Sequence, residues 1–198
     1  MKELRTALRV LGILSLLVGV LYPLLVLGIA QLAFPHRANG SLILMDGRVV
    51  GSELIGQSFS LPQYLRGRPS SSDYDPRISG GSNLAPSNPI LLDRVVEDVK
   101  RVRAENGLAL GAVVPPDLVL ASGSGLDPDL SVEAALLQAE RIAAERGITP
   151  ETIRDIVQRH IQDSFLGAFG EPRVNVLEVN LALDALTGPG GMSRDATP

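Results

Sequence analysis

The chain carries one long apolar run near its start, VLGILSLLVGVLYPLLVLGIA at residues 10–30, and this run decides the architecture. Its 21 residues include no charged side chain. At about 1.5 Å of rise per residue, a helix of this length spans about 30 Å, the thickness of the hydrocarbon core of a bilayer. Backbone polar groups in that layer must be satisfied within the segment, so a helix is expected. We therefore predict a transmembrane helix over residues 10–34, preceded by a short terminus at residues 1–9.

Basic residues flank this run unequally. Lys2, Arg5 and Arg9 precede it, whereas Arg37 is the only basic residue close behind it. Because basic flanks stay on the cytoplasmic side, we expect a cytoplasmic N-terminus, a single pass through the cell (inner) membrane and an extracytoplasmic main domain. The alternative is a cleaved signal peptide ending near residues 28–30, but the run exceeds the about 7–15 apolar residues of such a peptide.

Small residues recur along the predicted helix. Gly12, Ser15 and Gly19 have the spacing of one helical face, which Tyr22 extends. Small side chains let a second membrane helix approach closely, and neighbouring helices tolerate a kink at Pro23. We therefore predict that this face contacts a partner helix. The alternative is that these glycines reflect only the high frequency of glycine in membrane helices.

Composition limits the function of the remaining chain. Residues 35–186 have the size of one domain, and the chain has no cysteine and therefore no disulfide. From residue 35 onward, 15 Lys and Arg stand against 21 Asp and Glu. This acidity argues against binding to nucleic acid, which requires clustered basic charge.

Capping and turn residues predict the secondary structure of this domain. Asp46-Gly47 predicts a hairpin over residues 41–50. Residues 56–89 lack periodicity and are rich in Pro, Gly and Ser, although their aromatic residues indicate packing rather than disorder. Asn88, Ser131 and Thr149 are expected to cap three helices, the first of which carries an apolar stripe from Leu92 to Val102.

Two further segments are expected to be extended. Residues 118–121 are apolar and predict a short buried strand or extended piece. Residues 177–184 alternate apolar and polar side chains, the period of a strand. The Gly/Pro-rich tail at residues 187–198 is expected to be flexible. The predicted fold is therefore α+β, with one N-terminal transmembrane helix followed by a single extracytoplasmic α/β domain.

Searches for catalytic and metal-binding motifs find no complete example. Neither lysine lies in a phosphate-binding loop, and Ser82 and Ser124 lack the glycines of a nucleophile elbow. His160 lies on an apolar stripe, which favours a packed or interface side chain, and the segment beginning at Asp127 lacks the glycine of a calcium loop. We predict no catalytic residue and no metal site. The alternatives are a membrane-anchored extracytoplasmic hydrolase using Ser82 or Ser124 and a solute-binding module.

Several separated motifs resemble, in order, those of the KdpC family, the C subunits of the Kdp potassium-transporting ATPase. They are GSELIGQSF (residues 51–59), GRPS (67–70), SGGSNLAPSNP (79–89), ASGSGLDP (121–128) and GEPRVNVL (170–177). The resemblance extends from the anchor to about Leu186. The chain departs from the family pattern at Leu65, where an aromatic residue is common, at Asp129, where histidine is usual, and at residues 162–164.

This resemblance implies a non-catalytic accessory subunit of an ATP-driven, high-affinity potassium uptake complex. The implied partners are the channel-like KdpA, the ATP-hydrolysing KdpB and the small KdpF, together with the lipid bilayer. No cofactor is expected on this chain alone, whereas the complex uses potassium and ATP. The family is also associated with a higher affinity of the complex for ATP; with the main domain outside the cell, we expect such an effect to be indirect.

Two polar loops are the remaining candidates for function, either as subunit contacts or as turns that shape the fold. For Asn83 and Asn88 the structural interpretation is favoured, since Asn88 already caps a helix. The candidate residues are Gly80, Gly81, Ser82, Asn83, Pro86, Asn88, Ser122, Gly123, Gly125, Asp127 and, in the last of the family motifs, Arg173.

Overall fold

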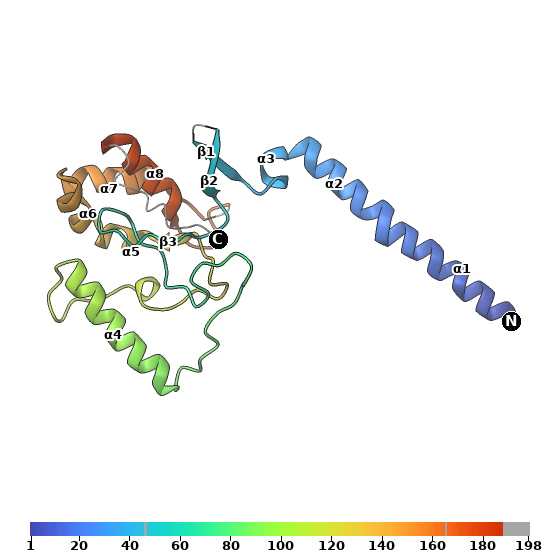
Figure 1. Cartoon of the computed structure of the whole chain (residues 1–198), viewed down its shortest axis with the longest axis horizontal. Helices are drawn as coiled ribbons and strands as arrows, with labels where there is room; N and C mark the ends of the chain where they lie inside the picture. Colours follow the sequence, from blue (N-terminus) through green and yellow to red (C-terminus); the bar gives the residue numbers. More distant parts are fainter. Residues whose placement is uncertain (46, 165, 188–198) are drawn as a thin grey trace. The chain divides into compact units, whose positions relative to one another are not determined.

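The computed structural model describes residues 1–45, 47–164 and 166–187 and divides the chain into two compact units, Met1–Ser52 and Glu53–Pro198. Helices and short strands occur together, as the predicted α+β class requires (Figure 1). Each unit is described by itself below.

The first unit begins with a long apolar helix. α1 (Lys2–Leu16) and α2 (Tyr22–Ala33) continue through a wide π turn at Leu17–Leu21, where the Tyr22 amide donates to the Leu17 carbonyl. The helix thus begins eight residues before the predicted start, and it ends one residue before the predicted end because Phe34 leaves the helical conformation. Its mean hydropathy reaches 2.6, and none of its apolar window is buried, so it is long and apolar enough to cross a membrane.

A short helix and a hairpin complete the first unit. α3 spans Pro35–Ala38, and the antiparallel strands β1 (Leu42–Met45) and β2 (Arg48–Ser52) follow. Met45 pairs with Arg48, which confirms the predicted hairpin, and the positive φ of Gly47 suits its tight turn. Asp46, the other predicted turn residue, lies outside the described residues.

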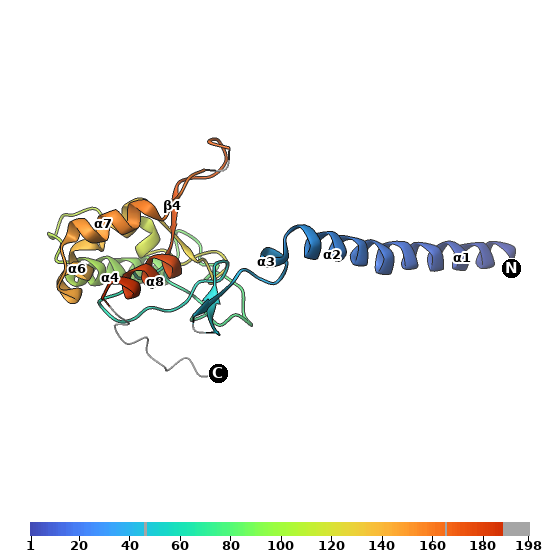
Figure 2. The ribbon, with the colours of Figure 1, turned by 90° about the horizontal axis from the view of Figure 1, so that it is seen from above.

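The second unit combines five helices with a three-stranded antiparallel sheet among its described residues. The sheet has the order β3-β5-β4, formed by Asp129–Ser131, Arg173–Asn175 and Ile161–Gln162. Figure 2 shows the connection from β4 extending away from the body of the unit. The helices are α4 (Pro89–Glu105), α5 (Val132–Leu137), α6 (Ala139–Arg146), α7 (Pro150–Arg159) and α8 (Val176–Thr187).

The predicted helix starts are confirmed by hydrogen bonds of the capping side chains. Asn88 accepts from the Ile90 amide, Ser131 from the Ala134 amide and Thr149 from the Thr152 amide. The second predicted helix, however, is divided into α5 and α6 at Gln138.

The predicted apolar stripe of α4 is only partly buried. Leu92 and Val96 are exposed, Val95 and Val99 pack against the core from its edge, and Val102 alone is buried. The stripe therefore indicated the helix correctly but overstated its burial.

Two predicted extended segments are wrong. Leu118 ends a 3-10 turn at Pro116–Leu118 and residues 119–121 continue from it without forming a strand, although Leu118 and Val119 are buried. Residues 177–184 belong to helix α8. The alternation of apolar and polar side chains predicted a strand wrongly, because the helix also buries two polar side chains. These are Asn180 and Asp184, on the face that carries Val176 and Leu183. Residues 188–198 of the predicted tail lie outside the described residues.

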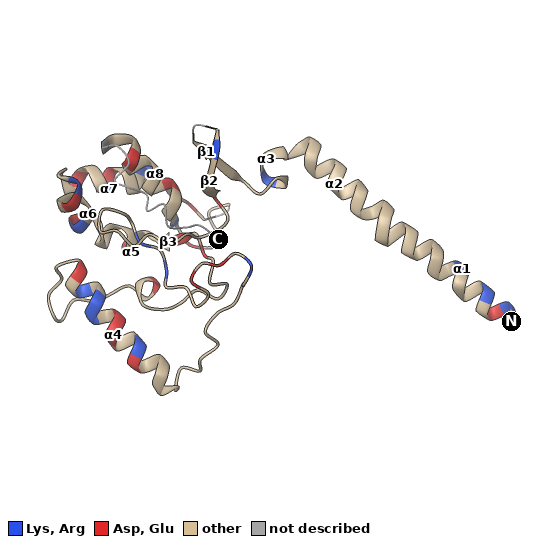
Figure 3. Ribbon diagram, viewed as in Figure 1, with Lys and Arg blue, Asp and Glu red and all other residues tan. Residues whose placement is uncertain are grey.

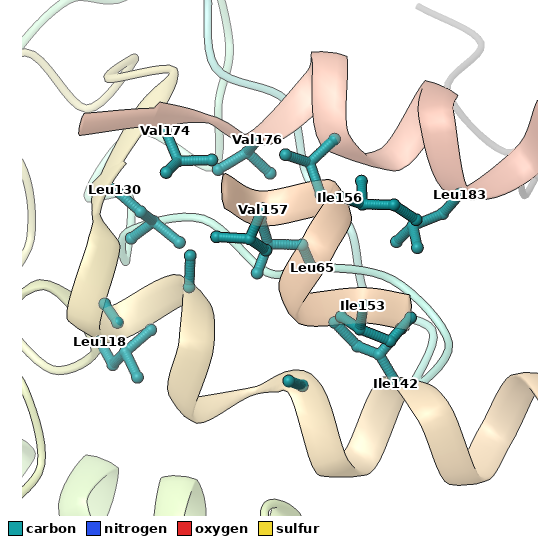
Figure 4. Close-up of a cluster of buried hydrophobic side chains, with 14 of the residues drawn as sticks. Leu65, Leu118, Leu130, Ile142, Ile153, Ile156, Val157, Val174, Val176 and Leu183 are labelled. Carbon is teal, nitrogen blue, oxygen red and sulfur yellow. The ribbon is translucent and has the colours of Figure 1, made fainter. Parts of the chain in front are cut away.

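The core lies between α5, α6, α7, α8 and the sheet (Figure 4). Leu130 and Val174 pair across β3 and β5. The helices contribute Ile142 from α6, Val157 from α7 and Leu183 from α8, all of them buried. Leu65, from the long segment without periodicity, is fully buried in the same cluster. The prediction that this segment packs is confirmed, and burial of an aliphatic side chain accounts for the leucine at this position.

Two amide side chains hold the backbone around Leu65. Asn180 Oδ1 accepts from the Leu65 amide at 2.8 Å, and Asn180 Nδ2 donates to the Leu65 carbonyl at 2.9 Å. Gln138 does the same for Arg66, with bonds of 3.0 and 3.1 Å. Side-chain amides thus give the backbone of this segment the hydrogen bonds that a neighbouring strand would otherwise provide.

Replacing Asn180→Ala should lower the free energy of unfolding by about 2–4 kcal/mol, because the buried amide and carbonyl of Leu65 both lose their partner. Urea unfolding of the full chain in detergent micelles, followed by circular dichroism, measures the loss. Gln158→Ala on the exposed face of α7 is the matched control and should cost less than about 0.5 kcal/mol. Equal losses in the two variants would contradict the role assigned to Asn180.

Candidate functional site

The two loops singled out in the sequence lie against each other. The Gly80 amide donates to the Ser124 carbonyl at 2.8 Å, and the Ser79 hydroxyl donates to the same carbonyl at 3.3 Å. A third segment joins them, since the Ser122 amide donates to the Pro69 carbonyl. We call these three segments, residues 67–74, 79–81 and 122–127, the loop cluster.

Gly125 lies at the centre of the loop cluster. Its φ is +70°, and its carbonyl accepts from the Ser70 hydroxyl at 2.6 Å. A Cβ atom here would lie 2.6 Å from Ser72 Oγ and 2.9 Å from the Gly80 carbonyl oxygen. Both the backbone conformation and the close approach of two neighbouring segments therefore require glycine.

Charged side chains close one side of the loop cluster. Arg68 Nη1 lies 3.0 Å from Asp127 Oδ2, while Asp127 Oδ1 accepts from the Asp129 amide. Asp129 in turn pairs with Arg173 at 2.9 Å, which joins the cluster to β5. Burial raises the pKa of the Asp129 carboxyl, although Arg173 opposes the shift.

The candidate loop residues therefore divide into two groups. Gly80, Gly81, Ser122, Gly125 and Asp127 meet in the loop cluster, where a Cβ on Gly81 would lie 3.2 Å from the Gly123 carbonyl oxygen. The remaining candidates lie at its edge or beyond it. A Cβ built on Gly123 would meet open space. In the loop before α4, Asn83 has a φ of +51° and lies near Ser82 and Pro86, and Asn88 caps the helix itself. Arg173 lies in β5.

Sequence reasoning missed several residues that build this region. The hydroxyl of Ser70 accepts from the amides of Ser72 and Tyr74, and the Tyr74 hydroxyl donates to the Arg68 carbonyl. Burial raises the pKa of Tyr74 to about 12, with Asp127 adding to the shift. The run Ser70-Ser71-Ser72 before an aromatic residue was the available signal, since serine hydroxyls commonly organise turns.

Ser124, one of the two serines of the hydrolase alternative, and His160 each have a structural hydrogen-bond partner. Ser124 Oγ accepts from the Leu126 amide inside the loop cluster. His160, half-buried at the end of α7, has its Nδ1 2.8 Å from the Ile156 carbonyl oxygen. Among the described residues, no group of three or more His, Cys, Asp or Glu side chains is arranged to hold a metal ion.

Among the described residues, one helix is long and apolar enough to cross a bilayer, and an α+β domain shaped by polar loops follows it, which is the architecture of a membrane-associated protein. The pattern of these loops matches a known family. The model of the family described as KdpC, K+-transporting ATPase, c chain, matches residues 4–185.

Relatives of similar length agree with this match. Three proteins named potassium-transporting ATPase KdpC subunit are 49%, 52% and 46% identical to this chain, from Rhodopseudomonas palustris (strain BisB5), Methylobacterium nodulans and Caulobacter vibrioides. The alignments cover 94%, 90% and 98% of this chain and 98%, 95% and 99% of the relatives. The chain belongs to the KdpC family and is thus a component of a potassium-transporting ATPase complex, as the sequence resemblance implied.

Replacing Gly125→Ala should destabilise the loop cluster by about 2–4 kcal/mol, because alanine is strained at positive φ and its Cβ would overlap two segments. Urea unfolding of the full chain in detergent micelles measures this change.

The neighbouring Gly123→Ala provides a matched control. Its Cβ would meet open space, so the substitution should leave stability unchanged or raise it by up to about 1 kcal/mol. If Gly125→Ala were as stable as Gly123→Ala, the central position of Gly125 would be refuted.

Proposed function

We propose that this chain is a non-catalytic accessory subunit that assists the ion-conducting and ATP-hydrolysing subunits of the potassium uptake complex. The observation that carries the proposal is the helix Lys2–Ala33, whose apolar side chains are uncovered by the rest of the described chain. Such a surface requires lipid or other membrane helices around it. The proposed partners are KdpA, KdpB and KdpF within the bilayer.

Three of the four proposed partner-facing residues are small, and all four are exposed. Gly12 and Ser15 lie in α1, Gly19 lies in the π turn, and Tyr22 begins α2. Apart from the adjacent backbone of the helix itself, no atom of the described residues lies within 4 Å of a Cβ built on Gly12 or Gly19. The space beside these glycines is therefore free for a second helix, whose close approach is the source of stability in such contacts.

The proposed orientation places the N-terminus in the cytoplasm and residues after the helix outside. Its support is the distribution of basic residues, which gather in the first turns of α1 and are absent from the rest of the long helix (Figure 3). Potassium and ATP are then used by the complex, with no cofactor bound by this chain alone. Because ATP is on the cytoplasmic side, any effect of the outer domain on nucleotide affinity is transmitted through the partner subunits.

The loop residues contribute to this function in two ways. Gly81, Ser122 and Gly125 are enclosed and fix the loop cluster, as their contacts require. Pro86 is exposed in the adjoining loop and is the proposed subunit-contact residue, whereas Asn83, which is exposed but has a φ of +51°, is assigned a structural role in the turn.

Replacing both Gly12→Ile and Gly19→Ile should reduce co-purification of the membrane partners at least about fivefold, because the bulky side chains keep a second helix backbone at a distance. Affinity purification of the tagged chain from detergent-solubilised membranes, with quantification of the partner subunits, measures this. Gly28→Ile in α2 changes the same residue type outside the proposed set and should leave recovery unchanged. Unchanged recovery of the double variant would remove these residues from the interface.

A reporter that is active only outside the cytoplasm, fused after Leu186, should be active, and a cytoplasm-specific reporter at the same position should be silent. The physical reason is the excess of basic residues before the helix. The intact mass of the purified chain is measured in parallel and should include residues 1–30. The opposite reporter pattern would reverse the orientation, and loss of those residues would indicate a cleaved signal peptide.

A further inference from the structure

An arginine-lined cavity lies between α4, α6 and the segment around Arg66. Its volume is about 150 Å³, far above the about 10–15 Å³ that one water molecule requires. Four arginines line it, Arg66, Arg68, Arg101 and Arg141, whereas Glu105 is the one carboxylate in its lining. The side chains of Arg66 and Arg68 are each 26% exposed, so this cationic surface is reached from solvent.

Carboxylates neutralise three of these arginines. Arg66 pairs with Glu105 at 2.6 Å, Arg68 pairs with Asp127, and Arg101 lies between Asp98 and Glu105. Glu105 is therefore shared by two arginines, which leaves the cavity with more positive than negative charge.

The fourth arginine is buried and bound only to neutral acceptors. Arg141 donates to Asn106 Oδ1, Gln138 Oε1 and the carbonyl oxygens of Pro62 and Tyr64. Burial lowers the pKa of Arg141 to about 10, and repulsion from Arg66 adds to the shift, while attraction to Glu105 and Glu145 opposes it. A buried guanidinium without a carboxylate partner is costly, and a nearby anion would reduce this cost.

Two N–H groups of arginines that line this cavity have no hydrogen-bond partner among the described residues. The Nε atoms of Arg66 and Arg68 are buried, and neither has a hydrogen-bond partner in the part of the chain that the structure describes. Gly67 separates the two arginines in sequence and also lines the cavity. Buried donors without partners are rare in folded proteins, and a bound ligand is one way of satisfying them.

We propose that this cavity binds a small oxyanion with the chemistry of phosphate or sulfate. The planar guanidinium presents several N–H groups in a fixed arrangement that matches the oxygens of such an anion, whereas a single-atom anion such as chloride meets fewer of them. The bound anion adds negative charge close to the buried Arg141, whose hydrogen bonds all go to neutral acceptors, and it ties α4 and α6 to the segment between them. The site therefore stabilises the outer domain and is separate from the chemistry of ion transport.

Thermal unfolding of the full chain in a zwitterionic detergent, titrated with inorganic phosphate against chloride at matched ionic strength, tests this site. Phosphate should raise the unfolding midpoint saturably, and chloride should not. Arg66→Gln and Arg101→Gln should each weaken the phosphate dependence at least about fivefold. Arg77→Gln, at a position whose side chain is 81% exposed and outside the cavity, should retain the full dependence.

Three results would overturn the proposal. They are equal midpoints in phosphate and chloride, an undiminished phosphate dependence in both cavity variants, and a shift produced by added anionic lipid but not by phosphate. Isothermal titration calorimetry with phosphate gives a second readout at a temperature where every variant is folded. Heat of binding in wild type that is retained in Arg77→Gln and lost in Arg101→Gln would support the site independently of stability.

Discussion

The structure of the second unit depends on the pairing of side-chain amides with the backbone at Leu65 and Arg66. Leu65 is fully buried, so its amide and carbonyl cannot reach water, and within the described residues no strand pairs with its segment. Asn180 from α8 and Gln138 from the junction of α5 and α6 supply the missing partners. One extended segment is thereby fixed between two helical elements that are far apart in sequence.

A buried ion pair reinforces this arrangement on the side of α8. Arg146 and Asp184 meet at 2.8 Å with side chains only 3% and 4% exposed, and the Tyr64 hydroxyl donates to the second oxygen of Asp184. The Arg146 guanidinium also lies 5.0 Å from the centre of the Tyr64 ring. Because desolvation offsets much of the attraction in such pairs, their main consequence here is to hold α8, through Asp184, against Arg146 of α6 and against Tyr64.

The same segment connects the two sites discussed above. Its continuation through Arg68 and Ser70 forms one part of the loop cluster, and the side chains of Arg66 and Arg68 line the cavity. Ordering of this segment therefore places both the enclosed glycines and the excess positive charge. The apolar helix of the first unit is independent of it, since its conformation follows from its own composition.

The sequence by itself determined the apolar helix, the hairpin at Gly47 and the three helix starts at Asn88, Ser131 and Thr149. These features depend on local chemistry: uninterrupted apolar side chains, a glycine at positive φ and side-chain oxygens that cap free amides. Family membership was also readable from separated motifs. Only the tertiary structure decided that residues 176–187 form a helix. Asn180 and Asp184, whose polarity suggested the outer face of a strand, are buried beside partners that are distant in sequence, namely Leu65, Tyr64 and Arg146. The cavity was equally invisible in the sequence, because its four arginines come from three segments that are separate in the chain and meet only in the folded structure.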